Sequence, residues 1–347
     1  MPLSSRQISL TLHPWACSVK TLKFIKCSLA AVTLLASSLL AVGVATAATP
    51  DGGAIARKYA SLGSARGYLG PVVTPLRCGL VGNGCYQAFK GGSIYWSAAT
   101  GAHPTKGGIG GKWAQMGYEK SPLGYPATDE VCTGASTRTC TQRYQLGAIG
   151  WTAAKGTSVT PTAGSIALVV NKRRPNTPLN GSPADLTVVG NQYMRREAAT
   201  ALVRLSNAAA AAGVQITTVS GFRSYAAQAA LYNSYVAQYG RNVADTISAR
   251  PGYSEHQTGL AMDIGNPNGA CSLAACFANT PAGAYAARNA WRYGFIVRYP
   301  NGYSSITGYT YEPWHLRYVG VPLATDMHNR SARTLEQYLG LAAAPNY

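Results

Sequence analysis

The stretch Ser254-Glu255-His256-Gln257-Thr258-Gly259-Leu260-Ala261-Met262-Asp263 joins a histidine to an aspartate through a glycine and small or apolar residues. Glycine and a small residue let the chain pass closely from a loop that holds His256 into a strand that holds Asp263. Imidazole and carboxylate groups are common zinc ligands in proteins. The stretch therefore predicts a metal-binding cavity where the loop meets the strand.

A second motif, Glu312-Pro313-Trp314-His315, adds one more histidine and one more acid. Because Pro313 cannot donate to a sheet ladder, we expect an irregularity that turns Glu312 and His315 toward one cavity. Two imidazoles, one carboxylate and an open fourth position make a catalytic zinc site, whereas a structural site has four protein ligands. A lone histidine is more often structural, but two motifs of matching chemistry favour His256, Asp263 and His315 as ligands. His328 is expected to be exposed near a Pro-Leu-Ala-Thr loop.

The elements around these motifs mix helices and strands without strict alternation, which predicts an α+β fold with a small antiparallel sheet flanked by helices. We expect strands at 166–170, 214–219, 260–264, 295–299 and 309–318, helices at 195–213, 224–240, 281–293 and 332–339, and a turn at Asn301-Gly302.

An internal repeat with a period of 54 to 55 residues occupies residues 53–156. Lys58-Tyr59 returns as Lys112-Trp113, Cys78 and Cys85 return as Cys132 and Cys140, and Trp96 returns as Trp151. Both copies together hold one histidine, so catalysis is not expected there. The aromatic residues Tyr95, Trp96 and Trp151 are either core residues or sugar-binding platforms. Residues 157–165, rich in Thr, Pro, Gly and Ser, are predicted to be a linker.

Residues 1–47 have the features of a secretory signal peptide. Three lysines precede an apolar run at 29–44, which ends in Ala45-Thr46-Ala47. A retained membrane anchor is the weaker alternative, because the run is shorter than the roughly 20 residues of a spanning helix and a cleavage signature follows it. We therefore expect a secreted protein without a stable membrane anchor.

Six cysteines follow this segment as three close pairs. In an exported chain, such pairs favour the disulfides Cys78–Cys85, Cys132–Cys140 and Cys271–Cys276 over metal ligation or a catalytic thiol.

The chain has a net charge of +18, although only 12% of its residues are charged. No cluster of basic residues is longer than the three at 172–174, and no nucleic-acid motif is present. We interpret the charge as affinity for anionic polymers of a cell wall and expect no nucleic-acid partner. With 347 residues and 47% hydrophobic content, the chain is able to bury a core, which excludes wholesale disorder.

Two family resemblances follow from these motifs. Ser-x-His-x-x-Gly-x-Ala-x-Asp followed by Glu-x-x-His closely resembles the VanY-like D-alanyl-D-alanine carboxypeptidases, which cleave the C-terminal residue from peptidoglycan stem peptides, and places a zinc carboxypeptidase domain at 166–342. Leu123-Gly124-Tyr125-Pro126 and the aromatic strand resemble the LGFP repeat, thought to attach exported actinobacterial proteins to the cell envelope. The peptidase match extends to Ser220-Gly221-Phe222-Arg223-Ser224, Gln228, Arg250-Pro251-Gly252, Asn289-Ala290-Trp291, Tyr293-Gly294-Phe295 and Arg317-Tyr318-Val319-Gly320.

The resemblance implies Zn²⁺ bound by His256, Asp263 and His315, with Glu312 as the general base that later protonates the leaving amine. It also implies that Arg223 stabilises the oxyanion or orients the substrate. Ser254, Gln228 and Trp314 are then expected to contact the substrate. An ordinary ion pair for Arg223 and a turn-forming role for Ser254 are the alternatives. Where the family often has Tyr and His, this chain has Phe222 and Tyr253, which removes polar groups beside the pocket.

Other enzyme classes fit less well. A serine D,D-peptidase needs Ser-x-x-Lys and Lys-Thr-Gly, and both motifs are absent. An L,D-carboxypeptidase or endopeptidase on the same core stays open, as does a wall-binding protein without turnover. We expect the region from Ser165 onward to hydrolyse soluble peptides without the repeats.

Overall fold

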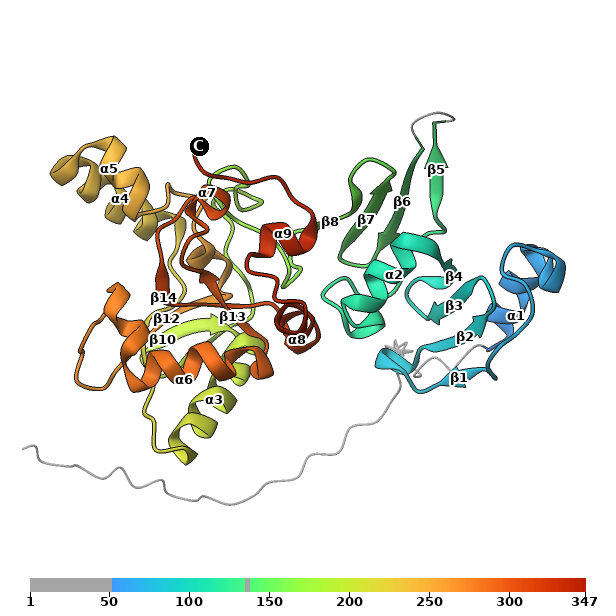
Figure 1. Cartoon of the computed structure of the whole chain (residues 1–347), viewed down its shortest axis with the longest axis horizontal. Helices are drawn as coiled ribbons and strands as arrows, with labels where there is room; N and C mark the ends of the chain where they lie inside the picture. The colour runs from blue at the N-terminus through green and yellow to red at the C-terminus, as the bar shows by residue number, and fades with distance from the viewer. Residues whose placement is uncertain (1–51, 135–137) are drawn as a thin grey trace, which may run out of the picture. The chain divides into compact units, whose positions relative to one another are not determined.

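The computed structural model describes residues 52–134 and 138–347 (Figure 1). The predicted signal peptide at 1–47 lies outside the described residues. All described residues belong to one compact unit. Among them, no helix has both the length and the apolar character needed to cross a membrane.

The predicted repeats are two units of the same design, each a short helix followed by a four-stranded antiparallel sheet in sequential order. The first contains α1 (Gly52–Ser61), β1 (Arg77–Cys78), β2 (Cys85–Phe89), β3 (Gly92–Ser97) and β4 (Gly101–Thr105). The second contains α2 (Gly107–Gln115), β5 (Val131–Thr133), β6 (Thr139–Tyr144), β7 (Gly147–Thr152) and β8 (Gly156–Pro161). Short 3₁₀ turns lie at Ser64–Arg66, Val81–Asn83 and Tyr118–Lys120. Tyr95 and Trp96 are buried in the cores, so they are not exposed sugar platforms.

Most of the predicted linker at 157–165 is a strand instead. β8 pairs with β7 along its whole length, and Val159, opposite Ile149, is fully buried. The sequence pattern of a strand is weak here, because one buried apolar residue stands among Thr and Ser. Pairing with β7 holds this segment in the strand conformation. The residues that follow are also packed, since Ser165 Oγ donates to the Pro122 carbonyl at 3.0 Å.

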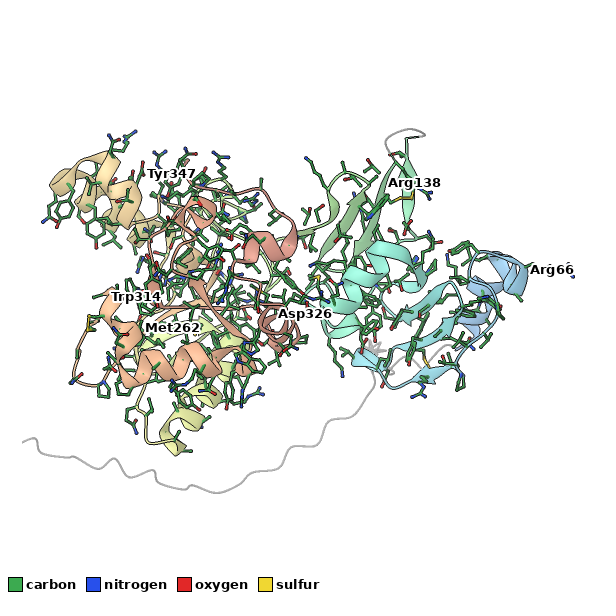
Figure 2. All side chains as sticks on the ribbon, in the orientation of Figure 1. Arg66, Arg138, Met262, Trp314, Asp326 and Tyr347 are labelled. Carbon is green, nitrogen blue, oxygen red and sulfur yellow. A yellow bond between two sulfur atoms is a disulfide. The ribbon has the colours of Figure 1, made fainter. Side chains whose placement is uncertain are left out.

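The three predicted disulfides are present, and their sulfur bonds appear in Figure 2. Cys78 and Cys85 are opposite one another across β1 and β2, with Cα atoms 4.0 Å apart. Cys132 and Cys140 repeat this arrangement across β5 and β6. Each repeat sheet is therefore cross-linked at the same position.

The C-terminal region is built on an antiparallel sheet in the order β11-β12-β14-β13, which confirms the α+β class. Helices α3 and α6 lie along one face of this sheet (Figure 1), and their apolar residues pack against those of β12 and β14. The strands are β9 (Leu186–Val189), β10 (Gln192–Arg195), β11 (Thr217–Ser220), β12 (Ala261–Gly265), β13 (Phe295–Tyr299) and β14 (Glu312–Tyr318). The α-helices are α3 (Arg196–Ala211), α4 (Tyr225–Tyr239), α5 (Arg241–Ile247), α6 (Pro281–Asn289), α7 (Ser304–Thr307), α8 (Val321–Asn329) and α9 (Leu335–Leu339), and 3₁₀ turns lie at Glu255–Thr258, Ala275–Asn279 and Ala290–Tyr293.

Several predicted elements of this region are wrong. Residues 166–170 form no strand. The Arg317 guanidinium donates to the Ile166 and Leu168 carbonyls at 2.9 and 2.6 Å. Hydrogen bonds from a side chain therefore take the place of those that a neighbouring strand would make to this segment. The Pro-Leu-Ala-Thr stretch is the first turn of α8 and not a loop. The last helix begins at Leu335, because Thr334 caps it by accepting from the Gln337 N–H.

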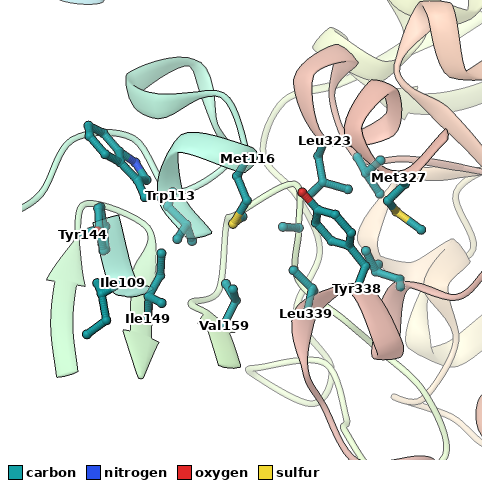
Figure 3. Close-up of a cluster of buried hydrophobic side chains, with 14 of the residues drawn as sticks. Ile109, Trp113, Met116, Tyr144, Ile149, Val159, Leu323, Met327, Tyr338 and Leu339 are labelled. Carbon is teal, nitrogen blue, oxygen red and sulfur yellow. The ribbon is translucent and has the colours of Figure 1, made fainter. Parts of the chain in front are cut away.

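The second repeat shares a hydrophobic core with the C-terminal helices (Figure 3). Trp113 and Met116 of the repeat belong to the same buried cluster as Leu323 of α8 and Leu339 of α9. Lys112 Nζ donates to the Tyr338 carbonyl at 2.6 Å and lies 3.8 Å from the centroid of the Tyr338 ring. The apolar surfaces of the repeat and of α8 and α9 therefore cover one another.

Candidate active site

Asp263 and His315 face each other across the central strands. They are register partners in β12 and β14, so their side chains leave the same face of the sheet. His315 Nδ1 lies 3.0 Å from Asp263 Oδ1, and His256 Nε2 lies 3.3 Å from Asp263 Oδ2. All three side chains are buried. The structure thus brings together the three residues that the sequence predicts as ligands.

Backbone contacts hold His256 in place. It lies on the 3₁₀ turn Glu255–Thr258, which ends at Gly259 with a φ of 66°. His256 Nδ1 lies 2.8 Å from the Gly221 carbonyl, which accepts the Nδ1 proton and leaves Nε2 free as a ligand. A side chain at Gly221 would begin 2.5 Å from the Tyr193 carbonyl, so only glycine fits. Gly221 stands in one of the motifs of the sequence, but the sequence alone predicts no role for it.

The donor set suits a metal cation. The ligand atoms of His256, Asp263 and His315 all lie within 4.8 Å of one another. The Asp263 carboxylate oxygens lie 3.0 and 3.3 Å from the two imidazole nitrogens, close to the spacing of about 3.4 Å that zinc bonds of 2.0 to 2.1 Å require. Asp263 Oδ1 is buried without a hydrogen bond of good geometry, and a cation would satisfy it. Burial lowers the pKa of His256, which favours the neutral imidazole that a metal needs. Burial opposes ionisation of Asp263, but the two imidazoles lower its pKa by more.

Glu312 begins β14, beside the ligands. The β13–β14 register shifts between Val297 and Tyr299, which confirms the irregularity expected near Pro313. Glu312 Oε2 lies 3.8 Å from His315 Nδ1, and Glu312 is absent from the group whose ligand atoms converge. Burial raises the pKa of Glu312 to about 7, opposed by His315 and reinforced by Asp263. A carboxyl group with such a pKa is suited to both accept and return a proton near neutral pH.

Arg223 presents an unpaired cation to the same cavity. Its guanidinium donates to Gln228 Oε1 at 2.8 Å and to Ser220 Oγ at 2.7 Å. No ion pair among the described carboxylates involves Arg223, so the alternative that Arg223 makes an ordinary ion pair is not supported. The remaining donors are available to an anionic group.

The three predicted substrate contacts differ in their environment. Gln228 Nε2 donates to Ser248 Oγ and to the Ala249 carbonyl, so its amide groups are used within the protein and it holds Arg223 in place. The Ser254 side chain makes no capping hydrogen bond at the turn that it precedes, which leaves the turn-forming alternative without support. Trp314 is half-buried at the cavity wall.

One cavity of about 340 Å³ connects these groups. Its lining includes every predicted site residue: Arg223, Gln228, Ser254, His256, Asp263, Glu312, Trp314 and His315. Tyr299 and Tyr309, for which the sequence predicts no role in the site, also line it. Phe222 and Tyr253 do not, so the differences from the family at these positions do not alter the wall.

Two regions of the chain are similar to known protein families. The D-alanyl-D-alanine carboxypeptidase family VanY matches residues 191–321, and the LGFP repeat matches residues 69–121 and 123–167.

Among curated proteins, the putative carboxypeptidase YodJ of Bacillus subtilis is 40% identical over 184 residues, which cover 50% of this chain and 67% of that protein. A D-alanyl-D-alanine carboxypeptidase of Enterococcus faecium is 37% identical over 150 residues, covering 43% of this chain and 45% of the relative. A solved LdcB LD-carboxypeptidase is 40% identical, with a TM-score of 0.48 and coverage of 51% of this chain and 87% of that one. The chain belongs to the VanY family of D-alanyl-D-alanine carboxypeptidases and carries two LGFP repeats before the peptidase region.

Proposed function

We propose that this protein is an exported, zinc-dependent carboxypeptidase that removes the C-terminal D-alanine of peptidoglycan stem peptides at the cell envelope. The observation that carries the proposal is the convergence of His256, Asp263 and His315 on one cavity, with Glu312 Oε2 3.8 Å from His315 Nδ1. Solved relatives include a VanY mutant in complex with Zn(II) and VanYB in complex with D-alanine-D-alanine.

Zinc, Glu312 and Arg223 have separate chemical roles in this proposal. When bound, zinc lowers the pKa of a coordinated water to about 7 and polarises the scissile carbonyl. Glu312 takes a proton from the attacking water and returns it to the leaving amine. Arg223, held by Gln228 and Ser220, faces the developing oxyanion or the terminal carboxylate of the substrate.

The direct test is digestion of defined muropeptides by the full chain, with the products weighed by mass spectrometry. Loss of one alanine from a pentapeptide stem supports the proposal, and a chelator should stop the reaction until zinc is returned. Loss of the fourth residue from a tetrapeptide alone would indicate an L,D-carboxypeptidase, and cleavage of cross-links would indicate an endopeptidase. A zinc-loaded chain inert on every stem peptide would identify a wall-binding protein without turnover.

We also propose that the repeats attach the enzyme to the wall and that the first repeat supplies the contact. Apolar side chains on it are exposed, among them Tyr68 at 50%, Val72 at 49% and Val73 at 65%. A group of exposed apolar side chains is typical of an interaction surface. The positive charge of the chain suits anionic wall polymers.

A further inference from the structure

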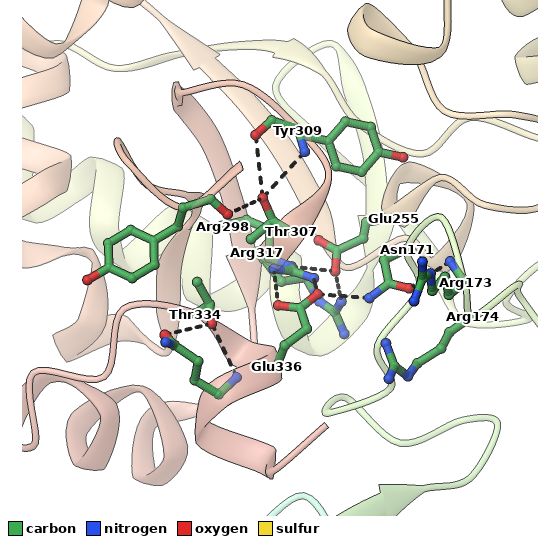
Figure 4. Close-up of polar contacts among 12 residues, drawn as sticks. Asn171, Arg173, Arg174, Glu255, Arg298, Thr307, Tyr309, Arg317, Thr334 and Glu336 are labelled. Atoms are coloured by element: carbon green, nitrogen blue, oxygen red, sulfur yellow. Dashed lines mark hydrogen bonds and ion pairs between the residues drawn. The ribbon is translucent and has the colours of Figure 1, made fainter. Parts of the chain in front are cut away.

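A buried ionic cluster contains Glu255, the residue directly before the candidate ligand His256 (Figure 4). Its members are Glu255, Arg298, Arg317 and Glu336, all with side chains about 0% exposed. Glu255 Oε1 accepts from Arg298 Nε at 2.8 Å and from Arg317 at 2.7 Å. Arg298 makes two further bonds to Glu336, at 2.9 and 2.6 Å.

The two arginines use the same oxygen of Glu255 and leave the other one without a partner. Glu255 Oε2 is buried and makes no hydrogen bond of good geometry. The nearest imidazole nitrogen is His315 Nε2 at 3.6 Å, which is also buried and also lacks a hydrogen bond. Because a buried polar atom without a hydrogen bond is destabilising, these two facing atoms are natural partners for one hydrogen bond between them.

The orientation of the His315 ring indicates what the contact between Glu255 and His315 does. Its Nδ1 faces Asp263 at 3.0 Å, so Nδ1 is the nitrogen directed at the metal position. A histidine ligand commonly donates its other N–H to a carboxylate, which fixes the tautomer and raises the basicity of the ligand nitrogen. Glu255 Oε2 lies on the side of the ring where such a carboxylate is needed.

Stability alone explains the cluster poorly. Four fully desolvated ionic groups cost about as much free energy as their mutual attraction returns, and apolar residues of similar volume are often as stable. The two arginines and two carboxylates balance in charge, and Glu255 contacts the arginines through one oxygen only. The arrangement therefore holds a carboxylate rigidly while keeping its second oxygen available.

We propose that Glu255 is a positioning residue, clamped by Arg298 and Arg317, that accepts the Nε2 proton of His315 and so directs the Nδ1 lone pair at the metal. This inference rests on the proposed function, because it assigns a role toward the metal of that site. Glu255 lies outside the group of converging ligand atoms, so the role proposed for it is to position His315 and not to hold the metal.

The test compares zinc affinity in zinc-free preparations of the full chain, measured by competition with a chromophoric chelator. Glu255→Gln should weaken zinc binding by about 10- to 100-fold, because an amide N–H facing His315 Nε2 favours the tautomer with a protonated Nδ1. Glu336→Gln is the matched control. It removes the same charge from the same cluster but contacts no group of the site, so its zinc affinity should stay within about threefold of wild type while its stability falls.

The outcomes separate the inference from the proposed function. Failure of the wild type to bind zinc would reject the function. Wild-type zinc affinity in Glu255→Gln, or an equal loss in both variants, would overturn the role of Glu255.

Should Glu255→Gln fail to fold, Glu255→Asp keeps the charge and withdraws the second oxygen by one methylene. Its zinc affinity should fall at unchanged charge. In the zinc-loaded wild type, the ¹⁵N shifts of His315 should show a proton on Nε2 and none on Nδ1, and a proton on Nδ1 would contradict the assignment.

Discussion

Glu312 and His315 are three residues apart in one strand and yet line the same cavity. Simple alternation would put residues at this spacing on opposite faces of a sheet. The register shift at this end of β14 accounts for the exception, because Pro313 offers no N–H to the ladder. The proposed general base and a proposed metal ligand thereby share one short segment.

Arg223 allows a test at the same scale. Arg223→Lys keeps the positive charge but removes the planar guanidinium. An ammonium group cannot donate to both Gln228 and Ser220 and still face the substrate. We expect kcat/KM on the pentapeptide substrate to fall by about 10²- to 10³-fold with zinc content unchanged. Steady-state kinetics beside metal analysis checks this, and a loss of zinc would show that Arg223 supports the fold of the site instead.

The convergence of the three proposed ligands could be predicted from the sequence, because each stands in a dense motif beside another proposed ligand or the proposed base. The contacts between Glu255 and the two arginines behind them could not be predicted in this way. Glu255 meets Arg298 and Arg317 across sequence separations of 43 and 62 residues. Nothing local marks such a pairing, although a glutamate directly before a ligand histidine in a chain poor in charge is a usable signal.

At the scale of elements, those with strong local signals were predicted well. α4 begins after the capping Ser224 and ends before Gly240, close to the predicted 224–240, and β13 has the predicted bounds. β8 and residues 166–170 were mispredicted because their order comes from distant partners, β7 in one case and Arg317 in the other.

Helix α9 carries Glu336, whose ionisation links the stability of this region to pH. Burial raises the pKa of Glu336, but Arg298 and several hydrogen bonds lower it by more, so it lies below the ordinary 4.5. The stabilisation is therefore present above pH 4.5 and is lost as the pH falls through and below that value.

Glu336→Gln should lower the free energy of unfolding by about 3 kcal/mol at pH 7, because Arg298 loses a buried partner. The difference from wild type should shrink steadily below pH 4.5. Urea unfolding at several pH values measures both, and a difference that is independent of pH would contradict ionisation of Glu336 in the folded chain.

At the scale of the whole molecule, the same repeat position makes successive contacts. Lys58 of the first repeat pairs with Asp129 of the second at 2.9 Å, and Lys112, its equivalent in the second repeat, bonds the Tyr338 carbonyl of α9. Each repeat thus uses one lysine to contact the unit that follows it. The second repeat also covers Leu323 and Leu339, which its removal would expose.

This contact changes the expectation for truncated chains. A chain that begins at Lys106 should fold and hydrolyse soluble pentapeptide at the full-length rate but bind isolated cell walls less well. A chain that begins at Ser165 should lose stability or aggregate, because apolar side chains of α8 and α9 become exposed. Thermal unfolding, hydrolysis and wall sedimentation compare them. A stable, fully active chain from Ser165 would contradict the shared core, and unchanged wall binding from Lys106 would contradict attachment by the first repeat.

The central claim is that Glu312 moves protons at a zinc site formed by His256, Asp263 and His315. The most direct measurement determines zinc content and D-alanine release together in Glu312→Gln and His315→Ala. Glu312→Gln should keep about one zinc per chain while turnover falls by about 10²- to 10⁴-fold. His315→Ala should lose zinc and turnover together, because a ligand is removed. A zinc-loaded Glu312→Gln chain with wild-type turnover, or a fully active His315→Ala chain without zinc, would contradict the account.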